Sequence, residues 1–311
     1  MAIREVSAGS FRWINITGAT ADDTPEVSYL REHFPYFQAL DIKDCVSNGQ
    51  RPKLEIHEKY AFLVLLFPVF NRKTREIEPT EIDFFIQKDL IITIHDERLH
   101  SVQHLFTEVK ALNAHPQAHL DNPLLLTAEL TNRQLNASLP MLDHISMDLH
   151  AIERLIFRGS EKSMVKEILV TRRNITDFRK IMQAHKNVVK KMEVANRVLQ
   201  LTEPETANAL LNNAVERTKE IWDHLEAFKE SVEALQQTNE SLISFRLNDI
   251  MKTYTTISVI IFTLTLATTI IAARLARTPL VDTDNGFYGL LGLLAIITGL
   301  SVYIFKRKRW L

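Results

Sequence analysis

Residues 253–273, TYTTISVIIFTLTLATTIIAA, and residues 286–305, GFYGLLGLLAIITGLSVYIF, decide the fold of this chain. Neither stretch contains a charged side chain, and each has about 20 residues, the length that a helix needs to cross roughly 30 Å of hydrocarbon. A buried core helix can be equally apolar, but two such stretches in succession favour two membrane-spanning helices. Residues 274–285 between them then form a loop outside the cytoplasm.

The charges that flank the two spans predict their orientation. Lys252 precedes the first span, and four basic residues follow the second: Lys306, Arg307, Lys308 and Arg309. Basic residues favour the cytoplasmic side of a membrane, so we expect residues 306–311 to form a cytoplasmic tail and both termini to be cytoplasmic. Arg274 and Arg277 in the loop oppose this rule but are outnumbered.

The composition agrees with a multi-pass protein of the inner (cell) membrane. The first ten residues show no apolar stretch typical of a signal peptide. The single cysteine, Cys45, excludes an intramolecular disulfide and favours a reducing compartment, and we expect it to be a small buried residue. A net charge of -1 gives no indication of a nucleic-acid partner.

The first part of the chain, residues 1–120, is predicted to be a cytoplasmic α+β domain. Strands are expected at 11–17 and 58–70, the second ended by Pro68, and a hairpin at 81–96 is connected through Lys88 and Asp89. Helices are expected from Pro25, with Thr24 at the cap position, and at 101–115. The sheet should have about four to six strands.

Long helices are predicted over residues 121–252, which form a stalk. They cover 121–157, 161–199 and a rod that begins near Thr206. Because no glycine or proline occurs between Pro204 and Pro279, the rod and the first span should be one helix of roughly 70 residues, on the order of 100 Å long. Apolar residues follow a heptad seam along it, which predicts an oligomer, with the polar Asn239 setting its register. The seam consists of Ile221, Leu225, Phe228, Val232, Leu235, Asn239 and Leu242.

The two long helices of the stalk carry opposite charges. Residues 161–194 contain nine basic and four acidic side chains, whereas residues 206–250 contain eight acidic and four basic ones. Either the two helices pack side by side, or both charged faces are simply solvated.

The heptad steps continue into the membrane as a stripe that is rich in hydroxyl groups. The stripe consists of Asn248, Met251, Thr255, Ser258, Phe262, Thr265, Thr269 and Ala272, five of which are polar. Polar groups in hydrocarbon should face protein or water, so the stripe is typical of a pore-lining helix, in which Met251 and Phe262 would form apolar constrictions. A hydroxyl-mediated contact between helices, without conduction, is the alternative.

Segments along nearly the whole chain resemble the CorA-type divalent-cation transporter family, in the family's order and spacing. They are RPKLEIHEKYAFLVLLFP (51–68), EIDFFIQKDLIITIHDE (81–97), LDHISMDLHAIERLIF (142–157), LNDIMKTYTTISVIIFTLTL (247–266) and the terminal KRKRWL (306–311). The resemblance implies a funnel-shaped homopentamer in the lipid bilayer, with the first span lining the pore and the second outside it. It also implies that Mg²⁺, or Co²⁺, Ni²⁺ or Zn²⁺, passes down its gradient as a transported or regulatory ion, without a cofactor.

Two departures from the family bear on this function. The family has Gly-Met-Asn at the end of the first span, where Ala272, Ala273 and Arg274 stand here, and the tripeptide occurs nowhere in the 311 residues. Five guanidinium groups around one axis would repel a divalent cation unless they were turned away or paired, and Asp282 and Asp284 are candidate partners or cation collectors. The family's cytoplasmic magnesium sensor uses carboxylates between subunits, where the matching positions here are two uncharged residues, Asn71 and Asn213.

Three hypotheses remain open from the sequence. The first is a divalent-cation channel with an altered outer mouth, and the second is a non-conducting or regulatory pentameric scaffold. The third, an anion pore, is weakened because the stripe contains no basic residue deeper in the membrane. An enzyme is not expected, because His57, His95 and His100 have no spacing typical of a metal or nucleophile motif and are interpreted as surface or core residues. No metal ligand is assigned.

Overall fold

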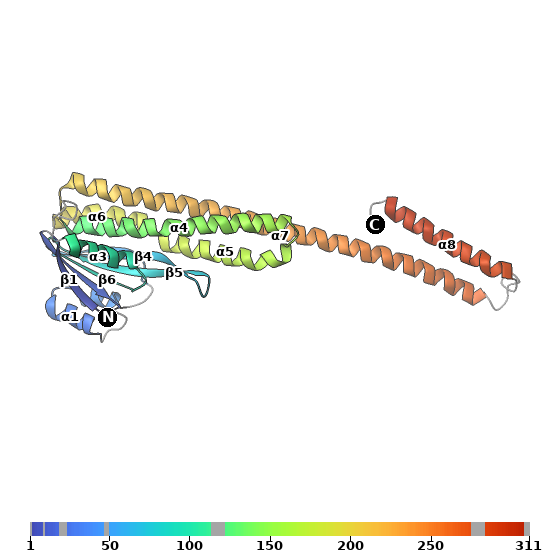
Figure 1. Ribbon diagram of the computed structural model, residues 1–311, viewed down its shortest axis with the longest axis horizontal. Coiled ribbons are helices and arrows are strands. Elements are labelled where there is room, and N and C mark those ends of the chain that lie inside the picture. The colour runs from blue at the N-terminus through green and yellow to red at the C-terminus, as the bar shows by residue number, and fades with distance from the viewer. Residues whose placement is uncertain are drawn as a thin grey trace. The chain divides into compact units, whose positions relative to one another are not determined.

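The structure is a computed structural model that describes residues 2–8, 10–18, 24–46, 50–112, 122–274 and 284–307 (Figure 1). Side chains are described up to residue 269 in the long helix α7 (Pro204–Arg274) and for some residues of α8 (Asp284–Arg307). The chain divides into two compact units, Met1–Gln236 and Gln237–Leu311.

Strands rich in Ile, Val and Phe form a six-stranded sheet within the described part of the first unit. The strands are β1 (Ala2–Ala8), β2 (Phe11–Thr17), β3 (Lys53–Ile56), β4 (Ala61–Asn71), β5 (Glu76–Ile86) and β6 (Leu90–His95), in the order β1-β2-β6-β5-β4-β3. Only the pairing of β2 with β6 is parallel among them. The predicted hairpin is confirmed, with Ile86 opposite Ile91.

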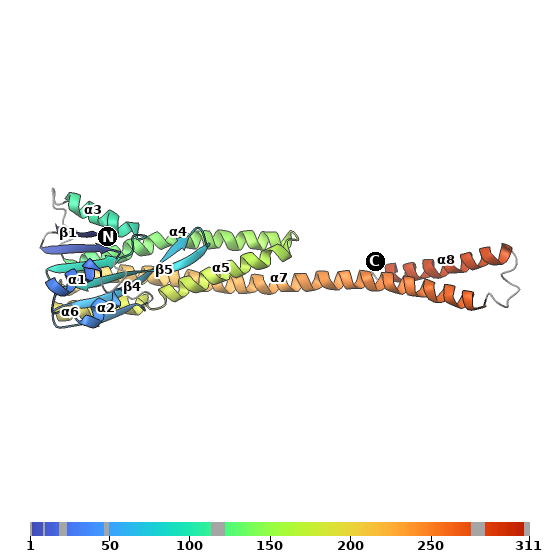
Figure 2. The ribbon, with the colours of Figure 1, turned by 90° about the horizontal axis from the view of Figure 1, so that it is seen from below.

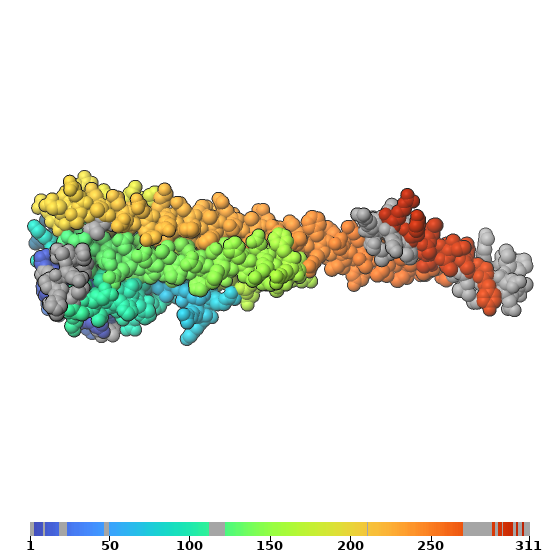
Figure 3. All heavy atoms as spheres, turned by 45° about the horizontal axis from the view of Figure 1, so that its top comes forward, coloured from blue at the N-terminus to red at the C-terminus, as the bar shows by residue number. Residues whose placement is uncertain are grey.

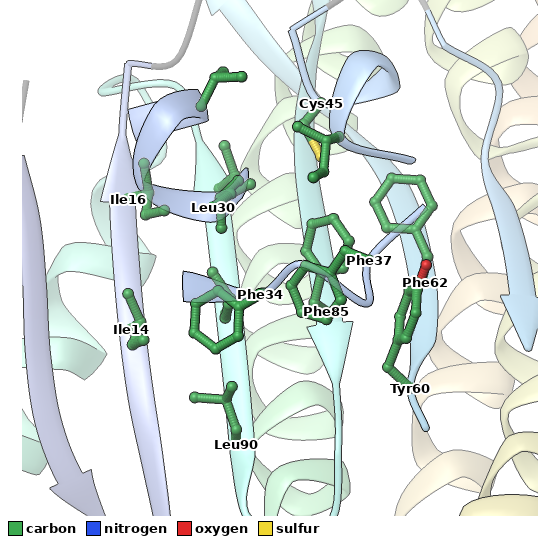
Figure 4. Packing of buried hydrophobic residues seen from close by; sticks show 14 of the residues in the cluster. Ile14, Ile16, Leu30, Phe34, Phe37, Cys45, Tyr60, Phe62, Phe85 and Leu90 are labelled. Carbon is green, nitrogen blue, oxygen red and sulfur yellow. The ribbon is translucent and has the colours of Figure 1, made fainter. Parts of the chain in front are cut away.

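Both faces of the sheet are buried, because apolar residues occupy successive positions that point to opposite sides. On one face, α1 (Pro25–His33) and α2 (Ala39–Asp44) cover an aromatic cluster in which Phe37 stacks on Phe85 at 4.3 Å (Figure 4). On the other face, Trp13 meets Phe106 of α3 (His100–Leu112) edge to face at 5.0 Å.

Cys45 follows α2 and is buried in this cluster, as predicted (Figure 4). Its thiol donates a hydrogen bond to the backbone oxygen of Asp41 at 3.1 Å. Burial raises the pKa of the Cys45 thiol well above its usual value, and nearby carboxylates raise it further. The residue is therefore an unreactive core side chain.

Pro68 does not end its strand, contrary to the prediction. It lies inside β4, directly opposite Pro79 of β5. The neighbouring strands pair only with residues 61–64 of β4 and residues 82–86 of β5, so this part of the hairpin extends beyond both. An N–H that points away from the partner strand has no ladder acceptor there, and a proline at such a position breaks no hydrogen bond.

Three helices pack against the second face of the sheet: α4 (Pro123–Phe157), α5 (Glu161–Met182) and α6 (His185–Leu199). Asn122 caps α4 by accepting a hydrogen bond from the backbone N–H of Leu125 at 2.9 Å. The prediction of one helix over 161–199 is wrong, because the helix is interrupted at residues 183–184. No glycine or proline marks this break. The break allows α5 to pack mainly on β5 and α6 to pack mainly on β3.

The break places His185 in a fully buried position, edge to face with Phe67 at 5.3 Å. Burial lowers the pKa of His185 to about 4, although nearby backbone carbonyls of Ile181 and Leu66 oppose the shift. An unfolded histidine has a pKa of about 6.5, so only the unfolded chain gains this proton as the pH falls below that value. The folded state should therefore lose stability between about pH 6.5 and pH 4, by up to about 3 kcal/mol from this group.

The variant His185→Phe keeps a ring against Phe67 and removes the titrating group. We expect its unfolding midpoint to fall less than that of the unaltered protein when the pH is lowered from 7 to 4.5. The exposed His150 provides the control, and His150→Phe should retain the original pH dependence. If His185→Phe also retains it, another group is responsible.

The helix α7 runs without interruption over 71 residues, as predicted. Within the first unit its seam is buried by the chain's own helices, with Ile221, Leu225 and Val232 fully buried. Figures 1 and 2 show α4 and α7 side by side, and Figure 3 shows their side chains in contact along the first unit. This part of the seam therefore does not require a second chain, which corrects the prediction that the whole seam faces partner helices.

The opposite charges of the two stalk helices meet in the structure. Arg179 of α5 forms an ion pair with Glu226 of α7 and lies over the ring of Trp222, with 5.2 Å between the guanidinium carbon and the ring centroid. About two helical turns earlier in α5, Arg172 donates a hydrogen bond to Gln236 at 3.1 Å. Of the two predicted alternatives, side-by-side packing is confirmed.

Candidate cation pathway

The polar stripe lies on the second part of α7. Its members with described side chains, Asn248, Met251, Thr255, Ser258, Phe262, Thr265 and Thr269, are all exposed in the single chain. From Asn248 to Thr269 the helix rises about 31 Å at 1.5 Å per residue, which matches the hydrocarbon thickness of a bilayer. The apolar Phe262 is 71% exposed and Met251 is 57% exposed. Both therefore remain available to form constrictions in an assembly.

The threonines of the stripe donate their hydroxyl protons to the helix backbone. Thr255 donates to the carbonyl oxygen of Met251 at 2.8 Å, and Thr265 donates to that of Ile261 at 2.8 Å. Each hydroxyl oxygen then offers only lone pairs outward, which suits a hard cation or its hydration shell. Thr263 lies off the stripe and makes the same kind of hydrogen bond. The stripe therefore differs from the rest of the helix in which face its residues occupy, and the hydrogen bonding is the same.

The length and hydropathy of α7 fit a membrane-spanning helix. In the part of the chain with described side chains, one helix, α7, is long and apolar enough to cross a bilayer by length and composition. Helix α8 has 24 residues, about 36 Å at 1.5 Å per residue, and runs back in the opposite direction to α7 (Figures 1 and 2). Before the span, Lys252 is paired with Asp249 at 3.3 Å. Tyr254 is 66% exposed at the position of a membrane-interface aromatic residue.

The residues predicted to form an outer mouth and to anchor the topology are only partly described. Ala272, Ala273 and Arg274 are the last residues of α7, and their side chains lie outside the described residues. The same holds for Asp284, which begins α8, and for Lys306 near its end. Asp282, Lys308 and Arg309 lie entirely outside the described residues, whereas Arg307 ends α8 and is exposed.

The positions predicted to match the family's magnesium sensor border different grooves of the single chain. Asn71 ends β4 and borders a groove of about 1270 Å³, while Asn213 of α7 borders one of about 450 Å³. The Asn71 side chain donates to Glu78 at 2.7 Å and accepts from the backbone N–H of Lys73 at 3.0 Å. Its amide therefore stabilises the β4–β5 turn.

The three singled-out histidines have different surroundings. His95 is a buried core residue, as interpreted, with its ring nitrogens 3.0 Å from the side-chain oxygen of Asn15 and 2.7 Å from the backbone oxygen of Asp96. Burial lowers its pKa. His100 is exposed at the start of α3. His57 is half-buried beside Asp41, which is itself fully buried.

Comparison with known proteins gives one consistent relationship. The profile of the family described as "CorA-like Mg2+ transporter protein" matches residues 8–307. The chain is 24% identical over 301 residues to the "Cobalt/magnesium transport protein CorA" of Thermotoga maritima, covering 96% of this chain and 83% of that protein. It is 21% identical over 272 residues to the protein of the same name from Methanocaldococcus jannaschii, covering 87% and 83%.

The fold has a solved counterpart. The complete structure of the CorA magnesium transporter from Methanocaldococcus jannaschii superposes with a TM-score of 0.81, at 19% identity, over 97% of this chain and 92% of that chain. The predicted architecture, an α+β domain followed by long helices, is thereby confirmed.

Proposed function

Because the chain belongs to the CorA-like Mg²⁺ transporter family, we propose that it conducts divalent metal cations down their electrochemical gradient through a pore on the axis of a homopentamer. Membership of a family of transporters also confirms the prediction that the chain is not an enzyme. Mg²⁺ is the first candidate ion, followed by Co²⁺, Ni²⁺ and Zn²⁺.

One observation carries the proposal: oxygen-bearing side chains follow a single face of one uninterrupted helix over about 31 Å. Residues 253–273 would line the pore, with Asn248 and Met251 at its cytoplasmic entrance. Residues 286–305 would form the outer span and residues 274–285 the external loop. The basic residues 306–309 support a cytoplasmic location for both termini, and with them for the α+β domain and the stalk.

A second candidate function is a non-conducting or regulatory pentameric scaffold. The sequence favours it at one point, where Ala272, Ala273 and Arg274 stand in place of Gly-Met-Asn. Alanine offers no side-chain oxygen to a hydrated cation, and an arginine that faced the axis would repel one. The two functions therefore differ in whether ions pass.

Ion flux into liposomes tests the proposal. Purified full-length protein is reconstituted with a Mg²⁺-sensitive dye inside the vesicles and compared with protein-free vesicles and with Arg274→Asn. We expect uptake by the unaltered protein, and parallel dyes for Co²⁺, Ni²⁺ and Zn²⁺ then rank the ions. Uptake that appears only after Arg274→Asn, or in neither protein, would overturn the transport proposal and favour the scaffold.

A further inference from the structure

A cluster of three metal-ligand side chains lies at the β3 edge of the sheet, in the first unit. Asp41 is on α2, Glu55 is on β3 and His57 immediately follows β3. One potential ligand atom from each lies within 4.8 Å of the others. Ligand atoms held about 2.1 Å from one ion are up to about 4.2 Å apart, so small side-chain rotations would close the site.

The Asp41 carboxylate is fully buried and only partly satisfied. Its Oδ2 accepts a hydrogen bond from the hydroxyl of Tyr60 at 2.6 Å. Its Oδ1 is buried and has no hydrogen-bond partner among the described residues. A buried oxygen without a partner is costly, and a bound cation would satisfy it.

The His57 ring, like the Asp41 carboxylate, has one buried atom that lacks a hydrogen-bond partner. Its Nε2 lies 2.9 Å from Asp41 Oδ2 as an ion-pair contact, and this buried nitrogen has no hydrogen-bond partner among the described residues. Its Nδ1 lies 3.2 Å from the side-chain amide of Gln38. When Nε2 binds a metal, Nδ1 carries the proton, and a half-turn of the Gln38 amide would present its oxygen to accept that proton as an outer partner.

Glu55 completes the site and leaves it open to solvent. One of its oxygens accepts from Lys53 Nζ at 2.6 Å, so its second oxygen remains available as a ligand. Asp44 also binds Lys53 Nζ at 2.6 Å, which draws the ammonium charge toward Asp44 and leaves the cluster with a net negative charge. The Glu55 side chain is 37% exposed, which gives an ion a path of entry.

We propose that Asp41, Glu55 and His57 bind a divalent transition-metal ion, with Zn²⁺, Co²⁺ and Ni²⁺ as the candidate class. An imidazole with two carboxylates suits these ions, whereas Mg²⁺ prefers oxygen ligands in an octahedral arrangement. The bound ion would join α2 to the end of β3. None of the three residues belongs to the proposed pathway, so this site is an addition to the transport function.

The test is metal titration of the full-length protein in detergent, after treatment with a chelator. Zn²⁺ binding is measured calorimetrically in a large excess of Mg²⁺, which occupies oxygen-only sites. Glu55→Gln and His57→Gln are compared with two matched controls, Glu58→Gln and His33→Gln, which alter exposed residues outside the cluster. X-ray absorption at the zinc edge reports imidazole coordination independently.

We expect the unaltered protein and both controls to bind one more Zn²⁺ per chain than His57→Gln, and Glu55→Gln to bind it at least about 10-fold more weakly. The imidazole signal should be reduced in His57→Gln. Glu55→Gln changes a partly exposed residue with one described partner, so it keeps the test valid if His57→Gln unfolds. Equal stoichiometry and affinity in all five proteins would overturn the proposal and leave Asp41 and His57 as a structural pair.

Discussion

Ser258→Arg is expected to abolish divalent-cation uptake by the reconstituted protein. Ser258 belongs to the exposed polar stripe of α7 and would face the axis of a pentamer. Five unit positive charges about 6 Å from a divalent cation raise its energy by about 7 kcal/mol even with the dielectric constant of bulk water. Salt screens part of this energy, but a reduction of uptake by at least about 1000-fold remains the expected result.

The neighbouring residue provides a matched control. Ile257 lies at the same depth on another face of the helix and is 46% exposed in the single chain. An arginine there can extend its side chain toward the nearby interface, so Ile257→Arg should insert and conduct. Dye-reported uptake is measured for both variants after size-exclusion chromatography has shown equal assembly. Equal loss of uptake in both would contradict the assignment of the stripe to the pore.

Phe85→Ala is expected to destabilise the first unit by about 3–5 kcal/mol. Phe85 of β5 is fully buried, stacks on Phe37 at 4.3 Å, and lies 4.8 Å from the ring of Phe62 and 5.8 Å from that of Tyr60. Truncating a buried phenylalanine removes its transfer free energy and leaves a cavity, which together cost about 3–5 kcal/mol. This is a large share of a typical stability of about 5–15 kcal/mol.

The measurement is thermal unfolding of the full-length protein in detergent, with near-ultraviolet circular dichroism as the signal. Phe157→Ala is the control, because Phe157 is 67% exposed at the end of α4. Its truncation should change the free energy of unfolding by less than about 0.5 kcal/mol. Similar shifts in the two variants would show that the aromatic cluster does not stabilise the sheet.

Elements with a strong local pattern could be predicted from the sequence. The hairpin of β5 and β6 has runs of Ile and Phe separated by a two-residue polar connection, and these alone determine its register. Helix α7 could be predicted because it contains no glycine or proline after its first residue, Pro204. The polar stripe could be predicted for the same reason, because an uninterrupted helix determines which residues lie on one face.

The errors occurred where tertiary contacts determine the structure. Pro68 is tolerated because its strand has no second neighbour at that point, which only the assembled sheet shows. The break at residues 183–184 has no glycine or proline and depends on packing against the sheet. The strands β1 and β3 were missed because β3 has only four residues and the larger apolar residues of β1, Ile3 and Val6, are three positions apart rather than two.

The two candidate sites differ in the same way. The pathway depends on one helix, so its residues could be assigned from their spacing. The cluster of Asp41, Glu55 and His57 depends on α2, a helix of six residues, and on β3, a strand of four. Neither element has a pattern long enough to predict, and the sequence therefore gave no reason to associate Asp41 with His57.

The continuity of α7 restricts how the sequence of this chain can evolve. Each residue of a helix turns the chain by about 100°. Inserting or deleting one residue between Asn239 and Asn248 would therefore rotate the whole stripe by about 100° relative to the preceding part of α7. Insertions or deletions close to a whole number of helical turns would keep the stripe on the same face of the helix. Substitutions can alter the lining one position at a time, whereas a change in length acts on every position at once. The number of residues along this helix is thus constrained as strongly as their identity.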